Sequence, residues 1–570
     1  MTSTRIEKFA FSREALDSWS VTDLRHTNWP VVYTLDNSAA IYVGETGNAA
    51  GRMRQHLDSI SKADLEGVRV ILDETFNKSA CLDLESYLIR LFAGDGKFEV
   101  RNRNEGITDA QYYQRDTYRR KFEEIFIRLR ADGFFDKSIP EIENDDLFKL
   151  SPFKALTDDQ AGALENILEG IFHDVTEGRP STAFVIGEPG TGKTILAIYL
   201  MKLLRDIQFF PPDEDVSGDS AFSDFFVEGN RELLTNYRIG LVIPQQSLRD
   251  SVRKVFKKTP GLSEDMILTP FEVGESAADY DLLVVDEAHR LTQYAAQAHG
   301  TLVAKFRRIS QRLFGEGWES KTQLDWIRAR SRHQVFMLDI AQRVRPEDAG
   351  PAHFQGLLEA AQADQRRYYL QTQMRVAAGG DYVGYVRNVL AGTQRERIDF
   401  GEYDVRFFDD FDEMYDQIQK RESEAGLSRL VAGYAWDWRS RKDKQAYDIE
   451  LGSHKLRWNS QIVDWINSPK SRHEVGSIHT VQGYDLNYAG VIIGRDLRYD
   501  PEARKMVFHR PSYFDKRGKR NNNMLGIKYT DDDLLEFVRN IYAVLLTRGM
   551  KGTYLYVCDD FLRERLRPFF

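Results

Sequence analysis

The chain has 570 residues, of which 42% are hydrophobic and 29% are charged, and its formal net charge is −10. These values are typical of a soluble globular protein with several domains. The polar N-terminus does not resemble a signal peptide, and no apolar run approaches the roughly 18 residues that span a bilayer. With only Cys81 and Cys558, the sequence offers neither a disulfide framework nor a thiolate zinc site. We therefore expect a cytoplasmic protein without membrane contact, in which any nucleic-acid binding comes from local basic grooves.

Four segments are predicted in chain order. Residues 1–110 mix short strands and helices, and residues 111–150 form a charged helical connector. From residue 151 onward, strands alternate with helices in the pattern of parallel sheets. The expected fold class is α/β: a small mixed α/β domain followed by two parallel-sheet lobes, 151–369 and 370–570.

The first domain begins with a predicted hairpin. The runs Val31–Leu35 and Ala40–Gly44 read as two strands joined by a short polar turn. Arg52 and His56 are four residues apart and would share one face of the following helix. The polar and glycine positions that come in sequence here are Tyr33, Tyr42, Gly44, Arg52, His56, Glu85, Asn102 and Asn104.

This order resembles the GIY-YIG nuclease family, although the first motif reads VVY. The resemblance implies Mg²⁺-dependent phosphodiester cleavage, with Glu85 holding the metal and Arg52 neutralising the phosphate. Tyr33, or His56 acting with Tyr42, would take the proton of the attacking water. Asn102 is favoured over Asn104 as the orienting asparagine, because it follows a strand-like run. The alternative is a degenerate copy of the fold that only binds.

A second chemistry is indicated by GEPGTGKT, which lies between the apolar runs Ala183–Ile186 and Ile195–Ile198. A buried strand, a glycine-rich turn and an apolar helix in this order form a phosphate-binding loop. Its members are Gly187, Glu188, Pro189, Gly190, Thr191, Gly192, Lys193 and Thr194. Lys193 would add a positive charge at the phosphates, and Thr194 would offer a hydroxyl to Mg²⁺. The sequence therefore predicts that ATP and Mg²⁺ bind here.

The run Asp281–Val285 reads as a neighbouring parallel strand that ends in Asp286-Glu287-Ala288-His289. A carboxylate at this place holds Mg²⁺ in P-loop folds, which assigns that role to Asp286. Glu287 would orient or deprotonate the attacking water. Acidic residues after a strand are otherwise ordinary helix N-caps. In company with a P-loop, they favour hydrolysis.

Further polar residues recur next to apolar runs along the rest of the chain. They are Gln160, Asp339, Gln342, Arg375, His479, Gln482, Gly483 and Arg548. In this order they resemble the motifs of superfamily-one helicases, and within these the Schlafen-like group, over about residues 151–570. The resemblance implies two RecA-like lobes that close on ATP.

Each of these residues takes a role from the resemblance. Gln160 would read adenine, and Asp339 with Gln342 would form the sensor of the γ-phosphate. His479, Gln482 and Gly483 would couple nucleic acid to ATP. Arg375 and Arg548 would reach the γ-phosphate on closure. The sensor reads LDIAQ instead of a Gly-Asp pair, which leaves processive unwinding open.

Together these features predict a Mg²⁺-dependent DNA endonuclease fused to an ATP-dependent helicase or translocase. DNA rather than RNA is the expected partner, and the aromatic and basic stretches 436–444 and 508–520 are candidate strand-binding segments or else solvated basic loops. Such a fusion suits phage defence, restriction or repair. One alternative is a nucleotide-gated switch that controls the nuclease without translocation. The other is a nucleic-acid-binding adaptor with an inactive nuclease domain.

Overall fold

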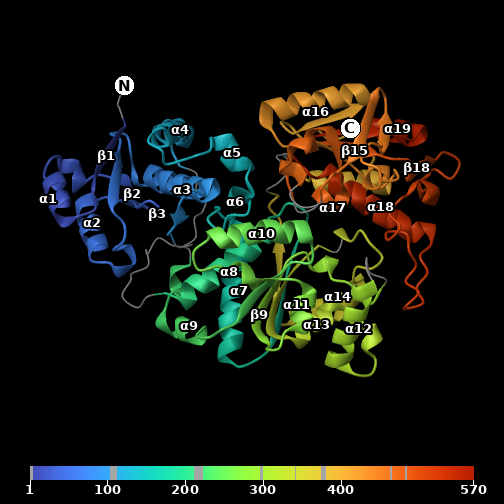
Figure 1. Ribbon diagram of the computed structural model, residues 1–570, viewed down its shortest axis with the longest axis horizontal. Coiled ribbons are helices and arrows are strands. Elements are labelled where there is room, and N and C mark those ends of the chain that lie inside the picture. The colour runs from blue at the N-terminus through green and yellow to red at the C-terminus, as the bar shows by residue number, and fades with distance from the viewer. Residues whose placement is uncertain are drawn as a thin grey trace. The chain divides into compact units, whose positions relative to one another are not determined.

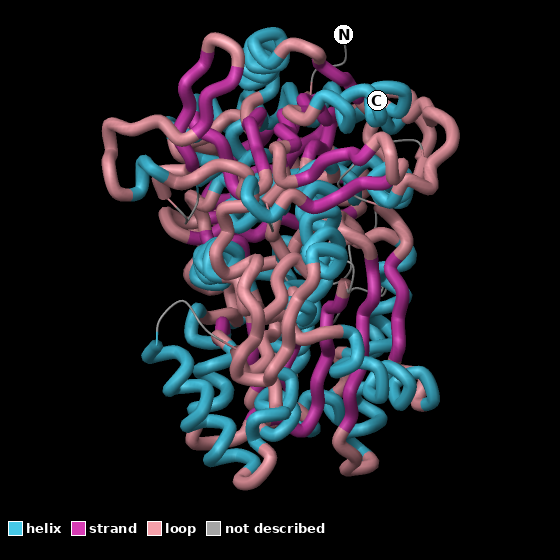
Figure 2. The backbone as a smooth tube through the Cα atoms, turned by 90° about the vertical axis from the view of Figure 1, so that its right-hand side faces the viewer, coloured by secondary structure: helices cyan, strands magenta, loops and turns pink. Residues whose placement is uncertain are grey.

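The computed structural model describes residues 4–102, 112–210, 222–295, 300–339, 342–373, 380–461, 465–481 and 484–570. Four of the predicted site residues, Asn104, Arg375, Gln482 and Gly483, lie outside these ranges. The chain divides into two compact units. One comprises Met1–Glu165, Ile198–Thr235 and Val252–Asp265, and the other comprises Asn166–Ala197, Asn236–Ser251 and Met266–Phe570. Helices and strands both occur throughout the backbone tube of Figure 2.

The N-terminal unit is built on a five-stranded sheet in the order β1-β4-β2-β3-β5. Its strands are β1 (Arg5–Ala10), β2 (Val31–Asp36), β3 (Ala40–Thr46), β4 (Gly67–Leu72) and β5 (Glu99–Val100). All pairs are antiparallel except β3 with β5. The predicted hairpin of β2 and β3 is confirmed, and the unit combines short strands with helices as expected.

Alternating side chains of β2 bury on opposite faces of this sheet, because neighbouring residues of a strand point to opposite sides. Val31, Tyr33 and Leu35 pack with the helices α1 (Arg13–Ser20) and α2 (Ala49–Leu57). Val32 packs on the other face with α3 (Lys78–Asp95). The sheet is therefore covered on both sides, and α3 runs beside β2 and β3 (Figure 1).

The segment expected to be a connector contributes to the N-terminal core. It forms α4 (Arg115–Ala131), α5 (Ile139–Asn144) and α6 (Asp146–Lys149). Phe122, Ile125 and Leu129 recur at helical spacing on α4 and are buried in the same apolar cluster as α3. This stripe gains more from burial against α3 than from exposure in a linker, so the helices extend the domain.

The second unit contains a six-stranded sheet in the order β11-β6-β10-β9-β7-β8, in which every neighbouring pair is parallel. The strands are β6 (Ser181–Gly187), β7 (Ile239–Val242), β8 (Ile267–Leu268), β9 (Tyr280–Val285), β10 (Ser331–Leu338) and β11 (Arg367–Leu370). The sequence prediction that β9 neighbours β6 is wrong, because β10, later in the chain, pairs with both. The carboxyl ends of all three strands still meet at one edge.

Helices alternate with these strands, as the sequence pattern predicts. They are α7 (Asp158–Thr176), α8 (Lys193–Gln208), α9 (Glu228–Leu233), α10 (Gln246–Lys258), α11 (Pro270–Glu275), α12 (Gly300–Phe314), α13 (Gln323–Ala329) and α14 (Pro351–Ala363). Phe184, Val285 and Phe336 from three neighbouring strands are buried in one cluster with side chains of α13 and α14. Apolar runs without polar alternation form these strands, since parallel strands are covered on both faces.

A second parallel sheet of seven strands follows, in the order β12-β20-β17-β13-β16-β15-β14, with only β14 and β15 antiparallel. The strands are β12 (Asp404–Phe408), β13 (Ser428–Ala432), β14 (Ile449–Leu451), β15 (His454–Trp458), β16 (Glu474–Ser477), β17 (Leu486–Ile493) and β20 (Gly549–Val557). A separate ribbon pairs β18 (Leu497–Asp500) with β19 (Lys505–Phe508). The predicted second parallel lobe is thus present.

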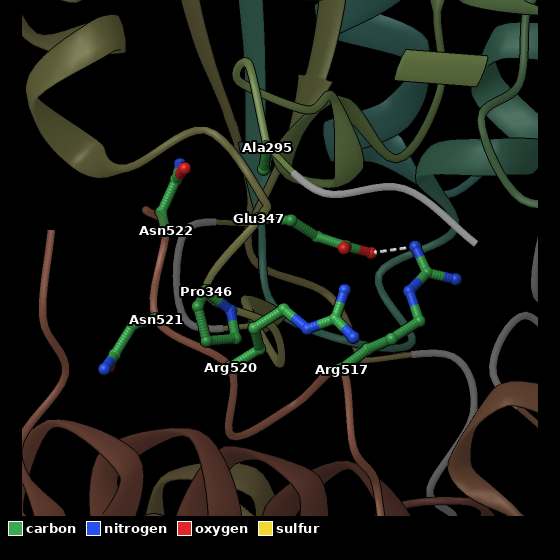
Figure 3. A pocket seen from close by; sticks show the side chains of 7 residues that line it. All are labelled: Ala295, Pro346, Glu347, Arg517, Arg520, Asn521 and Asn522. Atoms are coloured by element: carbon green, nitrogen blue, oxygen red, sulfur yellow. Dashed lines mark hydrogen bonds and ion pairs between the residues drawn. The ribbon is translucent and has the colours of Figure 1, made fainter. Parts of the chain in front are cut away.

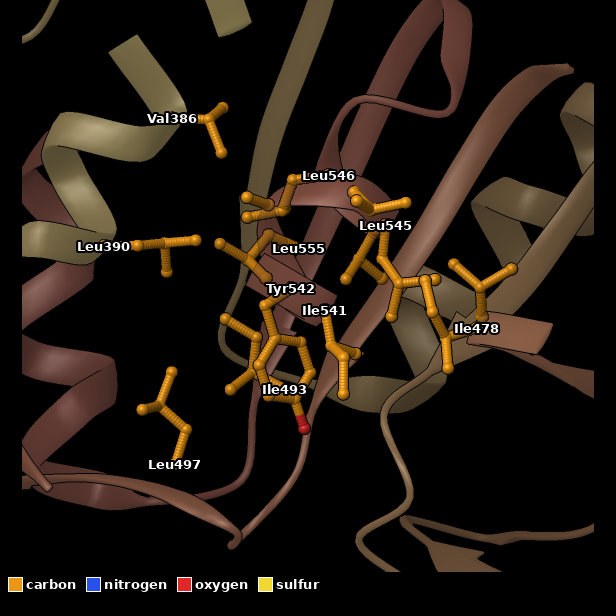
Figure 4. Close-up of a cluster of buried hydrophobic side chains, with 14 of the residues drawn as sticks. Val386, Leu390, Ile478, Ile493, Leu497, Ile541, Tyr542, Leu545, Leu546 and Leu555 are labelled. Atoms are coloured by element: carbon orange, nitrogen blue, oxygen red, sulfur yellow. The ribbon is translucent and has the colours of Figure 1, made fainter. Parts of the chain in front are cut away.

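In the described part of this lobe the α-helices are α15 (Tyr382–Ala391), α16 (Phe411–Ala425), α17 (Ile478–Val481), α18 (Asp531–Leu546) and α19 (Asp560–Leu566). Tyr542 and Ile541 of α18 pack with Ile493 and Leu555 of the sheet, as Figure 4 shows. In the part of the chain that the structure describes, no helix combines the length and the apolar character needed to cross a membrane.

Candidate active sites

The first candidate site is a cluster of polar side chains on β2, β3 and α2. Tyr33 of β2 lies opposite Gly44 of β3 in the antiparallel register. A Cβ atom added at Gly44 would lie 2.4 Å from the Tyr33 hydroxyl oxygen. Glycine is therefore required at this place, because only its backbone leaves room for the tyrosine ring.

The predicted tyrosines and histidine come together around a buried hydrogen bond. The Tyr33 hydroxyl and His56 Nε2 are 2.6 Å apart. The ring centroid of Tyr42 lies 6.2 Å from that of Tyr33 and 5.4 Å from that of His56. Lys62 Nζ lies 2.9 Å from the other ring nitrogen, His56 Nδ1, and 4.0 Å from the centre of the Tyr42 ring.

Sequence reasoning missed Lys62. It lies in a short 3-10 turn, Ile60–Lys62, beyond the end of α2. A lysine in a turn has no periodic relation to the helix before it. No pattern in the sequence therefore marks it as a partner of His56.

Burial and charge set the protonation of this cluster. Burial, followed by the charges of Lys62 and Arg52, lowers the pKa of His56 to about 2, so its ring is neutral near pH 7. Burial raises the pKa of Tyr33, and Arg52 acts in the opposite direction. For Arg52, burial alone would lower the pKa, but the oxygens of Tyr33 and Tyr42 more than offset it, and the pKa is raised. Arg52 is therefore a permanent cation beside both hydroxyls.

Glu85 and Asn102 complete the predicted set in different ways. Glu85 lies on α3, half-buried, and its charge acts on Tyr33. No group of three or more potential metal ligands occurs among the described residues. Asn102 instead exchanges two hydrogen bonds with the backbone of Val43, at 3.1 and 2.7 Å. It extends the pairing of β3 one residue before Gly44.

The second candidate site is the P-loop at the carboxyl end of β6. Gly190 and Gly192 have φ angles of 89° and 80°, a region that other residues rarely adopt. Lys193 begins α8 and donates to the carbonyl oxygens of Gly187 and Glu188, at 2.6 and 2.9 Å. The lysine thus lies over the loop, where phosphate oxygens would replace the carbonyls as its partners.

Asp286 and Glu287 follow β9 and are both buried. The hydroxyl of Thr194 donates to Asp286 Oδ2 at 2.7 Å. Burial and the neighbouring Glu287 raise the pKa of Asp286. Burial would also raise the pKa of Glu287, but His289, whose Nε2 lies 3.0 Å away, lowers it.

Glu287 has φ 50° and ψ 43°, a left-handed conformation that is strained for a residue with a side chain. Its backbone N–H donates to Asp286 Oδ1 at 2.9 Å. Strain of this kind persists where the surrounding structure holds a residue in place. Here it sets the direction of a predicted catalytic carboxylate.

Several residues of the second sheet's lobe and its linker reach the P-loop. Arg387 of α15 forms an ion pair with Glu188 at 3.0 Å and lies 3.8 Å from Asp339. Gln373 donates to the carbonyl oxygen of Pro189 at 2.7 Å. The two predicted sensor residues lie together, because Gln342 donates to Asp339 at 2.9 Å. No motif marks Arg387, which is a lone cation on the mostly apolar helix α15.

Three other predicted residues have partners within the protein. Arg548 is buried and donates to the carbonyl oxygen of Tyr484 at 3.2 Å, within its own lobe. His479 contacts Arg345 at 2.5 Å, and burial lowers the pKa of this histidine to about 3. Gln160 accepts from the backbone of Thr157 at 3.1 Å, at the start of α7.

The two basic stretches differ. In the second, Arg517 forms an ion pair with Glu347 at 2.5 Å, and Arg510 pairs with Asp531 at 2.7 Å. Figure 3 shows Arg517 and Glu347 pointing toward one another at the wall of a small pocket, with Arg520 beside them. Arg510 and Arg517 of this segment are therefore already paired with carboxylates of the protein.

The first stretch carries exposed cations beside two half-buried tryptophans, Trp436 and Trp438. The cations are Arg439, Arg441, Lys442 and Lys444. Exposed cations next to aromatic rings are typical of surfaces that bind single strands.

Known proteins are similar to the part of the chain that carries the P-loop and the two parallel sheets. Residues 180–559 match the family model of the Schlafen group 3 DNA/RNA helicase domain. The uncharacterized protein YPL245W of Saccharomyces cerevisiae is 27% identical over 420 residues, which are 68% of this chain and 84% of the yeast protein.

Two solved structures are also similar. Arterivirus nonstructural protein 10, a helicase in complex with DNA, has 13% identity and a TM-score of 0.26, over 71% of this chain and 64% of the viral chain. The Pif1 helicase from Bacteroides, in complex with ADP-AlF3 and ssDNA, has 10% identity and a TM-score of 0.24, over 68% of this chain and 91% of the bacterial chain.

Proposed function

The chain belongs to the Schlafen group 3 DNA/RNA helicase domain family, and on this basis we propose that it is an ATP-driven DNA translocase or helicase joined to a Mg²⁺-dependent endonuclease. One observation carries the motor half. Thr194 and Asp286 are hydrogen-bonded at 2.7 Å, beside a Glu287 in a strained conformation. This arrangement supports the proposal of nucleotide hydrolysis, because P-loop enzymes hold Mg²⁺ with a hydroxyl and a carboxylate at these places.

Thr194 and Asp286 fit Mg²⁺, which prefers hard oxygen ligands and keeps several waters. Their oxygens already lie side by side, and a cation would offset the burial that raises the pKa of Asp286. When bound, Mg²⁺ would neutralise charge on the β- and γ-phosphates. Lys193 would exchange its two carbonyl partners for phosphate oxygens. Glu287 would orient the attacking water and accept its proton.

Arginines would couple hydrolysis to movement of the lobes. Arg387 is placed to leave Glu188 and bind the γ-phosphate, since its guanidinium lies at the P-loop. Arg375 keeps the γ-phosphate role that its motif implies. Arg548 would reach the phosphate only if the bond to the Tyr484 carbonyl is broken on closure. Developing charge on the phosphate would then be neutralised from the second lobe.

The nuclease half rests on the cluster of Tyr33, His56 and Arg52. Arg52 would neutralise the phosphate under attack, and the Tyr33 oxygen would take the proton of the attacking water. Glu85 would hold Mg²⁺, which when bound polarises the phosphate and stabilises the leaving oxygen. A single carboxylate fits this ion, because Mg²⁺ commonly binds proteins through one or two carboxylates.

ATP turnover tests the motor half. Lys193→Ala should abolish DNA-stimulated ATP hydrolysis and leave the folded protein intact, whereas Lys455→Ala, at an exposed position, should behave as wild type. Normal turnover by Lys193→Ala would disprove the assignment of the P-loop.

Plasmid cleavage in Mg²⁺ tests the nuclease half. Glu85→Gln should lose cleavage, and Glu124→Gln, on the exposed face of α4, should retain it. If both variants cut as wild type does, the cutting comes from elsewhere. If wild type binds DNA equally well with chelator and cuts nothing, the N-terminal domain is an adaptor.

A nucleotide-gated switch is a second candidate, favoured by the contacts of Arg387 and Gln373 with the P-loop. A nucleotide must displace the Arg387–Glu188 pair to place its phosphates, so binding alone could rearrange the second lobe. Full cleavage with a non-hydrolysable ATP analogue would favour this candidate over a translocase.

A further inference from the structure

Both ring nitrogens of His56 have a partner, and one of the partners can only donate. Lys62 Nζ lies 2.9 Å from Nδ1, and the Tyr33 hydroxyl lies 2.6 Å from Nε2. An ammonium group has three N–H donors and no acceptor, so Nδ1 must be the acceptor. A neutral imidazole carries one proton, which is then on Nε2 and is donated to the Tyr33 oxygen.

From this geometry we propose that Lys62 is a positioning residue that fixes His56 as the Nε2–H tautomer and thereby turns the Tyr33 oxygen toward its role as general base. The inference rests on the proposed nuclease function for its purpose, but the tautomer itself follows from the contacts. His56 is buried, and its lowered pKa keeps the ring neutral.

The consequence lies in what surrounds the Tyr33 oxygen. The charged and titratable groups that face it are Tyr42 of β3, Arg52 and His56 of α2, Glu85 of α3, and Lys62 through His56. Burial, Tyr42 and Glu85 oppose ionisation, and Arg52 favours it. A donated bond from Nε2–H adds to the effect of Arg52, because hydrogen bonds to a charged form stabilise that form. With the opposite tautomer, the Tyr33 hydroxyl would have to donate to Nε2. Of the groups named above, Arg52 alone would then favour the ionisation of Tyr33.

Two bonds to phosphorus change in the proposed cleavage step. The oxygen of water forms a bond to phosphorus, and the bond from phosphorus to the leaving oxygen breaks. Because burial raises the pKa of Tyr33, its hydroxyl first has to lose its own proton to solvent. The ionised oxygen then takes the proton of the water, while His56 keeps its own proton throughout. Lys62 takes part in none of these bond changes.

The tautomer can be measured without any cleavage. The full-length chain, labelled with ¹⁵N-histidine, should give an Nδ1 shift of the unprotonated type and an Nε2 shift of the protonated type for His56, assigned by their loss in His56→Gln. Lys62→Met keeps most of the apolar stem and removes the donor, so both tautomers should become populated. Lys62→Arg, which restores a cationic donor, should return the Nε2–H tautomer.

Cleavage gives an independent second reading. Lys62→Met should lower cleavage near neutral pH by roughly ten- to a hundredfold, a part of what general-base catalysis contributes. The rising limb of the rate–pH profile should move to higher pH, because Tyr33 loses a donated bond and ionises less readily. A merely structural lysine would change the rate without moving the profile.

The two failures can be told apart. A wild-type His56 protonated on Nδ1, or a tautomer unaffected by Lys62→Met, would overturn the inference whether or not DNA is cut. The expected tautomer in a protein that cuts no DNA would support the role of Lys62 and reject the nuclease function.

Discussion

At the scale of single residues, two positions are constrained by what stands next to them rather than by their own chemistry. Gly44 leaves the space that the Tyr33 ring occupies. Glu287 keeps a left-handed backbone that its side chain disfavours, beside the buried Asp286. Both constraints act on the geometry of a candidate site, and both can be tested by substitutions that add or remove few atoms.

Gly44→Ala should damage the proposed nuclease site more than the fold. The new methyl group would overlap the Tyr33 hydroxyl, so the ring must shift and disturb its hydrogen bond with His56, at a cost of about 1–3 kcal/mol for overpacking. Cleavage assays and thermal melting should show a large loss of cutting with a modest fall in Tm. Gly47→Ala, where the methyl group meets nothing within 4 Å, is the matched control. Equal behaviour of the two variants would show that the position of Tyr33 does not matter.

Arg387→Ala distinguishes two roles for this residue: a contact with the γ-phosphate, or a latch that holds Glu188 of the P-loop through an ion pair. If Arg387 contacts the phosphate in the transition state, its loss should lower kcat tenfold or more with little change in KM. Arginines in this role contribute about 10³- to 10⁵-fold to kcat. Steady-state ATP hydrolysis with saturating DNA measures both constants. Arg395→Ala, at an exposed position in the same lobe, should leave them unchanged. A lower KM with unchanged kcat would instead identify Arg387 as a latch.

Site residues that belong to one local motif can be predicted from the sequence. Site residues that lie outside the motif are missed. Tyr33, Gly44 and His56 are adjacent in space because a hairpin and the helix after it fold locally. Lys62 lies in a turn and Arg387 on a distant helix, so neither has a fixed spacing in the sequence from the other residues of its site. Only packing in three dimensions brings such residues to a site.

At the scale of elements, the pattern of strands and helices was largely readable, but neighbours in a sheet were not. The strands β6, β9 and β10 are apolar runs that any reading of the sequence finds. Their order is not readable, because β10 comes after β9 in the chain and inserts between β6 and β9. In α4, the apolar stripe was visible, whereas its burial against α3 depends on the shape of the N-terminal core.

The two basic stretches give a test at this scale. Changing Arg439, Arg441, Lys442 and Lys444 to glutamine should weaken single-stranded DNA binding at all sequences, because these exposed cations can release counterions. The slope of log affinity against log salt should fall by at most about 3, from roughly 0.7 per phosphate contact. Arg510→Gln should change the slope little, since its charge is already paired with Asp531. An unchanged slope in the fourfold variant would exclude this stretch from the binding surface.

Asp496, after β17, gives the lobe a pH-dependent stability. Burial raises its pKa to about 7, and the Tyr542 hydroxyl donates to it at 2.6 Å. Between about pH 4 and pH 7 the folded state then binds more protons than the unfolded state, whose pKa is about 3.9, so stability falls as pH rises through this window. The contribution is about 4 kcal/mol at most.

Asp496→Asn, which resembles the protonated acid, removes this dependence. Its Tm should match that of wild type near pH 4–5 and exceed it near pH 8, with circular dichroism melts as the measurement. Asp437→Asn, at an exposed position, is the control and should follow wild type. A Tm difference that does not change with pH would mean that Asp496 is ionised in the folded protein throughout.

At the scale of the whole molecule, the proposed function would join two chemistries that both act on phosphates but place different demands on the protein. The proposed nuclease cluster would need rigid placement of Tyr33, Arg52 and His56, and these residues lie on or beside a sheet that is covered on both faces. The P-loop needs partners that can leave, and Lys193 and Arg387 are held there by contacts that a nucleotide can replace. One part is therefore suited to fixed geometry and the other to change.

If the motor licenses the nuclease, DNA cleavage must depend on ATP hydrolysis, whereas ATP hydrolysis must not depend on cleavage. Plasmid cleavage in Mg²⁺ should then require ATP in wild type and be lost in Lys193→Ala, whereas Glu85→Gln should hydrolyse ATP normally on DNA while cutting nothing. Time courses of cleavage and phosphate release from the same reactions measure both. Lys193→Ala that cuts without ATP would reduce the motor to a device for positioning. Cleavage supported fully by a non-hydrolysable analogue would favour the nucleotide-gated switch, because binding energy alone then suffices to rearrange the lobes.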